Sequence, residues 1–112
     1  NMEKLYKKNC MACDGNATSF DIGKIHKYLK KINGWEVKKD NKNSYYLEKK
    51  FKFKNFIKSQ EFINKISKIA ELQSHHPDIH FGWGYAKIKI FTHAIGGLRE
   101  NDFILASKID QI

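Results

Sequence analysis

The sequence predicts an α+β protein with two layers, in which helices pack on one face of a four-stranded antiparallel sheet. Three observations support this fold class. Segments that alternate between apolar and polar residues occur in two pairs, each joined by a short turn sequence. Segments with helical spacing precede, separate and follow these pairs, which gives the order α-β-β-α-β-β-α. The 112 residues, 41% of them hydrophobic, suffice for one compact domain with its own core.

The N-terminal segment, residues 1–18, is polar and shows no apolar periodicity. We therefore expect a mobile or loosely docked lead-in, followed by a single domain over residues 19–112. The lead-in contains Cys10 and Cys13 in a C-x-x-C pair, but a structural zinc site needs four ligands and the sequence has no second cysteine pair. We interpret both thiols as structural or incidental. Two cysteines give no disulfide framework, so a reducing compartment is expected.

The first helix is expected within residues 19–34. Its apolar residues recur at helical spacing and are Ile22, Ile25, Leu29 and Ile32. Ser19 can cap its N-terminus, Asp21 suits its first turn, and Gly34 can end it.

The first pair of strands is expected within residues 35–54. Trp35 and Val37 share one face of a short strand, and the following KDNKN is typical of a turn. In the second strand one face holds Tyr45, Leu47, Phe51 and Phe53, and the other holds Tyr46, Glu48, Lys50, Lys52 and Lys54. Lys49 falls on the apolar face, which indicates a strand end, a bulge, or a lysine stem that follows apolar surface to reach water.

The longest helix is expected to begin after Asn55, which is a suitable N-cap. Its inward face is expected to hold Ile63, Ile66, Ile69, Ala70 and Gln73. The final helix is expected within residues 99–112, with Ile104, Ala106 and Ile109 among its inward residues.

The second pair of strands lies between these two helices. Its alternating apolar residues are Ile79, Phe81 and Trp83, then Ala86, Ile88 and Ile90. A two-residue turn at Gly84–Tyr85 would join two strands. The competing interpretation is one long strand with a bulge near Gly82 or Gly84.

The charge is strongly basic, with 21 Lys and Arg residues against 12 Asp and Glu residues and a net charge of +9. Nearly all of this positive charge is lysine, and Arg99 is the only arginine. Proteins that read nucleic acids rely on arginine for bidentate contacts, so nucleic-acid binding is unlikely and a solvated basic surface is favoured. The sequence also lacks an apolar run of the roughly 20 residues that a membrane-spanning helix needs.

Two adjacent histidines, His75 and His76, stand directly before Pro77, where the longest helix is expected to end. The residue before a proline is disfavoured in the helical conformation, so this junction can direct both rings into one cavity. Glu71 lies one helical turn before His75 and can orient that ring by accepting a hydrogen bond from it.

A third histidine, His93, is expected near this pair, because strand pairing about the predicted turn returns the chain toward residues 76–77. Asp102, in the first turn of the final helix, can orient a ring from the side. Three converging histidines are compatible with zinc or iron ligation, with proton transfer near the ordinary imidazole pKa of about 6.5, or with a purely structural role. We expect His26 and His80 to be ordinary surface residues.

The residues of this constellation form a pattern with fixed gaps, consisting of Glu71, His75, His76, Pro77, Trp83, His93 and Asp102. This pattern resembles the signature of the pterin-4a-carbinolamine dehydratases. The stretches INGW, FKFKNF and THAIGGLRENDFILASKI, and the C-x-x-C-x-G motif, are also similar to that family, so the resemblance covers about residues 10–112. One departure is Arg99, which stands where members often place Ser or Thr and removes an expected N-cap of the final helix.

The resemblance implies a hydro-lyase that removes water from 4a-hydroxytetrahydrobiopterin and yields quinonoid dihydropterin in tetrahydrobiopterin recycling. It implies a pterin substrate, no metal, no organic cofactor, a cytoplasmic location, and a homodimer or homotetramer. The alternative is a non-enzymatic adaptor or dimerisation module, or a basic nucleic-acid-binding protein, on the same fold.

The resemblance also assigns roles to individual residues. His75 and His93 would serve as acid and base in an unresolved order, and His76 would hold the pterin and share the proton transfer. Glu71 would orient His75, and Asp102 would support the pocket near His93. The other residues expected to contact the substrate are Pro77, Thr92, Ala94, Ile95 and Trp35.

Overall fold

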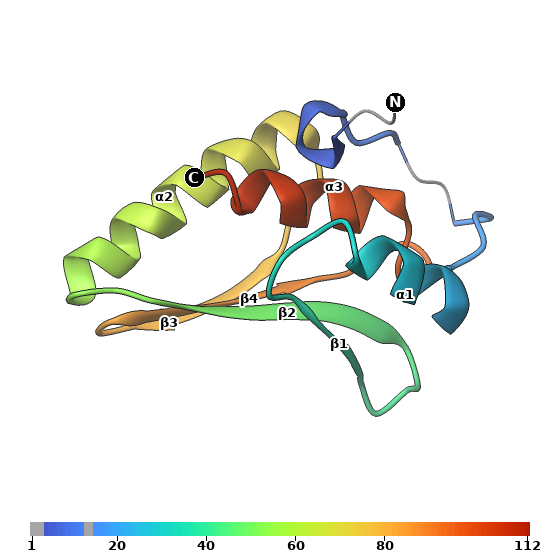
Figure 1. The fold of residues 1–112 in the computed structure, drawn as a ribbon, viewed down its shortest axis with the longest axis horizontal. Helices are drawn as coiled ribbons and strands as arrows, with labels where there is room; N and C mark the ends of the chain where they lie inside the picture. Colours follow the sequence, from blue (N-terminus) through green and yellow to red (C-terminus); the bar gives the residue numbers. More distant parts are fainter. Residues whose placement is uncertain (1–3, 13–14) are drawn as a thin grey trace.

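The helices of the protein lie on one side of an antiparallel sheet, as the ribbon in Figure 1 shows. The structure is a computed structural model that describes residues 4–12 and 15–112. Its elements are η1 (Leu5–Lys7), α1 (Ile22–Leu29), β1 (Glu36–Lys39), β2 (Tyr45–Lys52), α2 (Phe56–Gln73), β3 (Asp78–Gly82), β4 (Tyr85–Ile90) and α3 (Glu100–Ile109). The predicted fold class and element order are confirmed.

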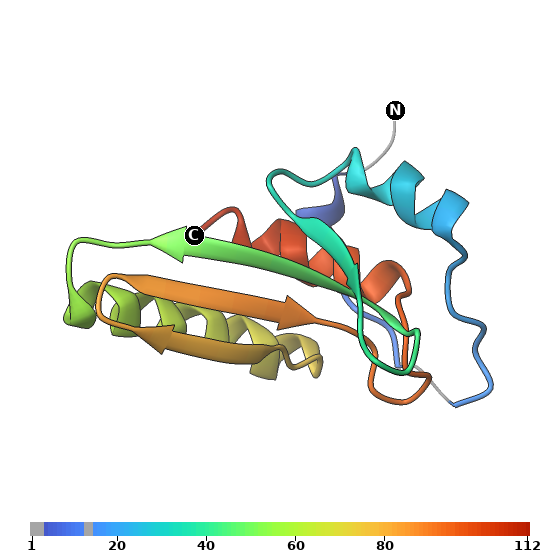
Figure 2. The same ribbon diagram turned by 90° about the horizontal axis from the view of Figure 1, so that it is seen from below.

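The sheet has the strand order β1-β2-β4-β3, and all three pairs of neighbouring strands are antiparallel. Figure 2 shows β2 and β4 in the middle, with β1 and β3 as the two edges. The register places Leu47 beside Ile90 and Ile79 beside Ile88, so the alternating apolar residues share the face beneath the helices. This arrangement brings the ends of α2 and β4 to the same side of the molecule.

The turn between β3 and β4 consists of Trp83 and Gly84, one residue earlier than the sequence predicts. Gly82 pairs with Tyr85, and Gly84 has a φ of 78°, a conformation that favours glycine. The turn therefore takes its glycine in the second position and not in the first. Trp83 is consequently 71% exposed instead of sharing the core face.

Helix α1 begins and ends at residues that differ from the prediction. Its N-cap is Asp21, whose carboxylate accepts a hydrogen bond from the Lys24 amide at 2.9 Å, so the predicted cap at Ser19 is wrong. The helix ends at Leu29, well before Gly34. Ile22 is exposed at the first helical position, because only one face of this short helix contacts the core.

Helix α2 has the predicted N-cap, since the Asn55 side chain accepts a hydrogen bond from the Lys58 amide at 3.0 Å. Its C-terminal end is set by Ser74, which adopts the left-handed conformation with a φ of 51°. The chain changes direction at Ser74. The site residues that follow it are therefore not placed by helical spacing.

The structure decides between the three explanations predicted for Lys49, the lysine on the apolar face of β2. Its ammonium group extends along the core edge to the Asp110 carboxylate at 2.8 Å and to the carbonyl oxygen of Asn33 at 2.6 Å. The indole N–H of Trp35 donates to the same carboxylate at 3.0 Å. Lys49 is thus a stem that follows apolar surface within a continuous strand, and its charge is paired.

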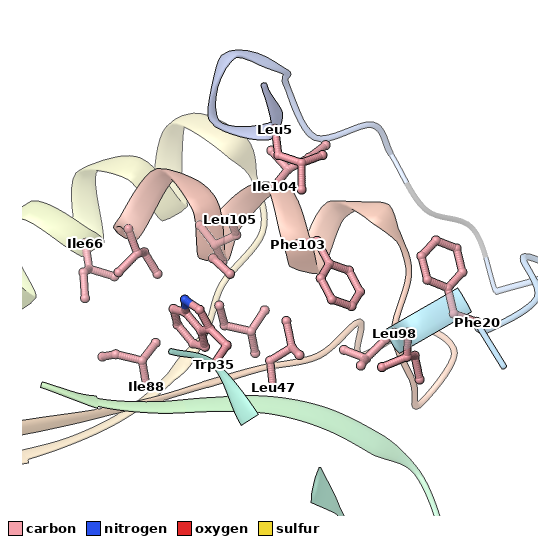
Figure 3. Packing of buried hydrophobic residues seen from close by; sticks show 14 of the residues in the cluster. Leu5, Phe20, Trp35, Leu47, Ile66, Ile88, Leu98, Phe103, Ile104 and Leu105 are labelled. Carbon is pink, nitrogen blue, oxygen red and sulfur yellow. The ribbon is translucent and has the colours of Figure 1, made fainter. Parts of the chain in front are cut away.

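The core lies between α3 and the sheet, as Figure 3 shows for Phe103, Leu105 and Leu47. Nearly every residue of α3 is buried, because η1 and the chain beyond it cover the side of α3 that faces away from the sheet. Leu5 of η1 belongs to the core cluster. The expectation of a mobile or loosely docked lead-in is therefore wrong for residues 4–12, whereas Cys13 lies outside the described residues.

Candidate active site

A groove of about 440 Å³ lies where the C-terminal end of α2, the loop after β4 and the lead-in meet. Its lining residues are Cys10, Met11, Ala12, Leu72, Gln73, Ser74, His75, His76, Thr92, His93, Ala94 and Asn101. The three histidines that the sequence predicts to converge therefore border one groove. They arrive from the two sides of the β3–β4 hairpin, as its antiparallel register requires.

His75 is the most buried of these histidines, and its Nε2 atom lies 2.7 Å from Oδ1 of Asp102. A carboxylate can only accept, so the hydrogen of this bond lies on Nε2. That leaves Nδ1 as the nitrogen that can exchange a proton with a ligand. Asp102 lies in the first turn of α3, and the ring that it orients from the side is that of His75. Its expected support of the pocket near His93 stays a prediction.

Asp102 is fully buried and accepts two further hydrogen bonds. The Thr92 hydroxyl and the Arg99 amide both donate to Oδ2 at 2.7 Å. The second bond satisfies a backbone donor at the start of α3, which compensates for the cap residue that Arg99 replaces. One side chain therefore fixes the start of the helix and the orientation of the His75 ring.

His76 pairs with Glu71, since its Nε2 atom lies 2.5 Å from Oε2 of that residue. The prediction that Glu71 orients His75 is therefore wrong. Both side chains of the observed pair are largely exposed, at 57% and 77%. Exposed ion pairs stabilise a protein by only about 0–1 kcal/mol, so this contact orients the ring more than it stabilises the fold.

His93 lies in the loop between β4 and α3 and is exposed at the groove. Its ring lies 4.2 Å from the Phe91 ring, measured between centroids. The loop is closed by a hydrogen bond from the Thr92 amide to the Gly97 carbonyl at 2.8 Å, which holds its two ends together. Packing and backbone pairing thus hold His93 at the groove.

The residues predicted to contact a substrate divide into three groups. Thr92 and Ala94 line the groove, as expected. Pro77 and Ile95 are chain neighbours of lining residues without being part of the lining, and their contact with a ligand stays a prediction. Trp35 is buried in the core beside Phe51, so the expectation that it lines the cavity is wrong.

The sequence did not indicate several lining residues, above all Cys10, Met11 and Asn101. Burial raises the pKa of the Cys10 thiol to about 11, with a smaller contribution from the negative charge of Asp102. Polar lead-in residues carry no periodic signal, and their contacts span about 90 positions along the chain. The Asn-Asp pair at 101–102 was the one available hint, because these two polar residues stand directly before the apolar run at residues 103–106.

Across residues 4–12 and 15–112, the histidine, cysteine and carboxylate side chains form no group of three or more that could hold a metal ion. Within the same part of the chain, every helix is too short or too polar to cross a membrane.

Comparison with known proteins decides the family. The family model described as pterin 4 alpha carbinolamine dehydratase matches residues 18–112. The chain belongs to the pterin-4-alpha-carbinolamine dehydratase family. Relatives that bear this family's name include one from Rubrobacter xylanophilus, 39% identical over 99% of this chain and 100% of its own. Another, from Halorhodospira halophila, is 41% identical over 96% of both chains.

Solved structures show the same fold for this dehydratase family member. The transcriptional coactivator/pterin dehydratase from Brucella melitensis has a TM-score of 0.75 at 23% identity, covering 84% of this chain and 97% of its own. A pterin dehydratase-like protein described as a RuBisCO assembly factor in the alpha-carboxysome has a TM-score of 0.60 at 22% identity. That match covers 70% of this chain and 88% of the other. At these identities the likeness establishes the fold alone.

Proposed function

We propose that the protein dehydrates 4a-hydroxytetrahydrobiopterin to quinonoid dihydropterin by histidine acid/base catalysis, in tetrahydrobiopterin recycling. The observation that carries this proposal is the meeting of His75, His76 and His93 at one groove in a chain of this family. Two of these rings have a carboxylate partner, and the third is held by packing. Such support fixes a ring in a defined orientation, which proton transfer requires.

The reaction suits these side chains. The C4a–O bond breaks with its electron pair, and the hydroxyl leaves as water after it accepts a proton. A ring nitrogen of the pterin loses its proton, and its electrons form the new double bond. Each transfer needs one positioned group and is typically worth roughly 10²–10⁴ in rate. Since both steps are proton transfers, imidazoles suffice and the proposed reaction uses no metal or organic cofactor.

His75 and His93 are the proposed pair of acid and base, because they differ most in environment. His75 is largely buried and is bonded to a buried carboxylate, whereas His93 is exposed and packs at a tilt against Phe91. The two roles, giving a proton and taking one, are therefore proposed for two rings that differ in burial and in their contacts. His76 is proposed to hold the pterin, oriented by Glu71.

Kinetics with single variants test this assignment. We expect His75→Ala and His93→Ala each to lower kcat for dehydration by about 10²-fold or more, with the far-ultraviolet circular dichroism unchanged. His80→Ala is the matched control, because His80 lies on β3 with its ring against Tyr85 and outside the groove. Wild-type rates in both groove variants would contradict the assignment. A wild-type protein without dehydratase activity would contradict the reaction and favour the adaptor alternative.

We also propose that the working form is a homodimer or homotetramer in the cytoplasm, as the family resemblance implies. The oligomeric state is tested by size-exclusion chromatography with light scattering, which measures mass directly. A mass near the 13.1 kDa of one chain at the concentrations used for kinetics would overturn the proposed oligomer.

A further inference from the structure

The two most exposed large hydrophobic side chains of the described residues border the same groove. Leu72 is 82% exposed and Met11 is 75% exposed, and both line the groove that holds the histidines. They reach it from different segments, since Leu72 lies in the last turn of α2 and Met11 in the lead-in. Exposed apolar side chains that gather at a concave site indicate a surface that a ligand covers.

Met11 is held at this position by defined hydrogen bonds. The side-chain oxygen of Asn101 accepts the Met11 amide hydrogen at 2.9 Å, and the side-chain nitrogen of Asn101 donates to the Met11 carbonyl at 2.5 Å. The carboxamide thus pairs with both polar groups of one backbone residue. Asn101 is itself largely buried and lies beside Asp102 on α3, so the segment is fixed to the helix that also positions His75.

A second amide fixes the other side of this segment. The Gln73 side chain accepts the Cys10 amide hydrogen at 2.7 Å and donates to the Asn9 side chain at 3.2 Å. Residues 9–12, which we call the strap, therefore bridge the end of α2 and the start of α3. Figure 1 shows the blue lead-in above α3, with which η1 is in contact. The strap is built into the rim of the groove.

We propose that the strap and the last turn of α2 supply the apolar walls of the pterin site. In this arrangement Met11 and Leu72 contact the pterin away from the reacting C4a atom and determine substrate affinity, and Asn101 and Gln73 are positioning residues that hold the strap. The proposal rests on the proposed function for the identity of the ring. Apolar contacts to ring atoms whose bonding does not change are equal in the bound substrate and the transition state, so they govern KM and leave kcat unchanged.

Steady-state kinetics test whether Met11 and Leu72 contact the substrate. We expect Met11→Ala and Leu72→Ala each to raise KM for 4a-hydroxytetrahydrobiopterin by about tenfold, with kcat within about twofold of wild type. Ile22→Ala is the control, because Ile22 is an exposed hydrophobic residue on α1, outside the groove. Unchanged KM values in both wall variants would overturn the proposal, as would an equal rise in the control.

Paired variants at one position test the strap. Gln73→Glu keeps an acceptor for the Cys10 amide, whereas Gln73→Leu has a similar size and no acceptor. We expect Gln73→Leu to raise KM about fivefold at constant kcat and Gln73→Glu to remain within about twofold of wild type. Equal KM values for the two variants would show that the hydrogen bond does not hold the wall.

Calorimetric binding of 7,8-dihydrobiopterin separates this proposal from the proposed function. If wild type binds the probe without catalysing dehydration, the proposed reaction fails, and weaker binding by Met11→Ala still supports the walls. If wild type is active and Met11→Ala keeps both its KM and its affinity for the probe, the walls alone are wrong. A wild-type protein that neither binds nor reacts overturns both.

Discussion

The Asp102 carboxylate has two tasks, because it lies both where α3 begins and beside the ring of His75, the proposed catalytic histidine. It accepts from the His75 ring, the Thr92 hydroxyl and the Arg99 amide, and it is fully buried. A buried carboxylate requires such donors, since leaving a buried polar group unsatisfied costs roughly 1–3 kcal/mol or more. The site's geometry is therefore tied to the stability of α3.

Cys10 allows a direct test of burial at the groove. Its pKa is raised from 9.0 to about 11, first by burial and then by the charge of Asp102. The thiolate fraction at neutral pH is then about 100-fold below that of an ordinary thiol, and thiolate is the reactive form. We expect the iodoacetamide alkylation rate of a Cys13→Ser protein to keep rising with pH from 9 toward 11. A rate that levels off near pH 9, as in the urea-denatured control, would contradict this.

The raised pKa of Cys10 also determines the direction in which the free energy of unfolding changes with pH. A thiol that ionises near pH 11 in the folded state and near 9 in the unfolded state retains its proton longer when folded. The free energy of unfolding contributed by this group is therefore fully present below pH 9 and is lost as the pH rises toward 11.

Sequence reasoning found the three histidines and both carboxylates but gave Glu71 the wrong histidine partner. Glu71 and His75 are four positions apart, and on a continuous helix they would face each other. Ser74 ends the helix in a left-handed conformation, so this spacing does not extend past it, and His76 returns to Glu71 instead. A backbone conformation at one serine, which periodicity does not reveal, decides which histidine each acid contacts.

At the scale of elements, the sequence predicted every α-helix and strand of the described residues, but it did not predict η1 and it misplaced several ends. Alternation fixes which residues face the core, so Leu47, Ile88 and Ile90 were assigned correctly. The exact end of a helix or strand depends on which of several neighbouring residues takes the capping or turn position. Asp21 caps α1 in place of the predicted Ser19, and the β3–β4 turn uses Gly84 as its second residue. Both outcomes are set by backbone conformation over one or two residues, which apolar patterns do not encode.

The end of α2 provides a test with matched substitutions. Ser74 has a φ of 51°, where glycine avoids a penalty of about 1–2 kcal/mol, so Ser74→Gly should raise the free energy of unfolding by about 1 kcal/mol. Ser67→Gly, in the middle of the same helix, should lower it by about 0.5–1 kcal/mol. Urea denaturation measures both. Changes of the same sign would contradict the left-handed end.

At the scale of the whole molecule, the sheet and helices were predictable and the docking of the lead-in was not. Among the described residues of the lead-in, only Leu5 belongs to the buried core cluster, and one apolar side chain creates no period. The lead-in is also anchored by the amide side chains of Gln73 and Asn101, more than 60 positions away. Such contacts form only when α2 and α3 have packed together. The sequence therefore did not predict this wall of the groove.

The free energy of unfolding shows whether the lead-in belongs to the folding unit. Leu5 is 5% exposed in the cluster that contains Ile104, so Leu5→Ala should lower the free energy of unfolding by about 2–3 kcal/mol. Met11→Ala, at an exposed position of the same segment, should change it by less than about 0.5 kcal/mol. Equal effects in urea denaturation would show that the lead-in does not contribute to the core.

The groove as the pterin site is tested most directly by nuclear magnetic resonance of the histidine rings during titration with 7,8-dihydrobiopterin. The five imidazoles give separate signals, and each is assigned by a single His→Gln variant. We predict that the signals of His75, His76 and His93 shift together with one dissociation constant, while those of His26 and His80 stay fixed. Shifts confined to His26 or His80, or no shift at saturating pterin, would contradict the site.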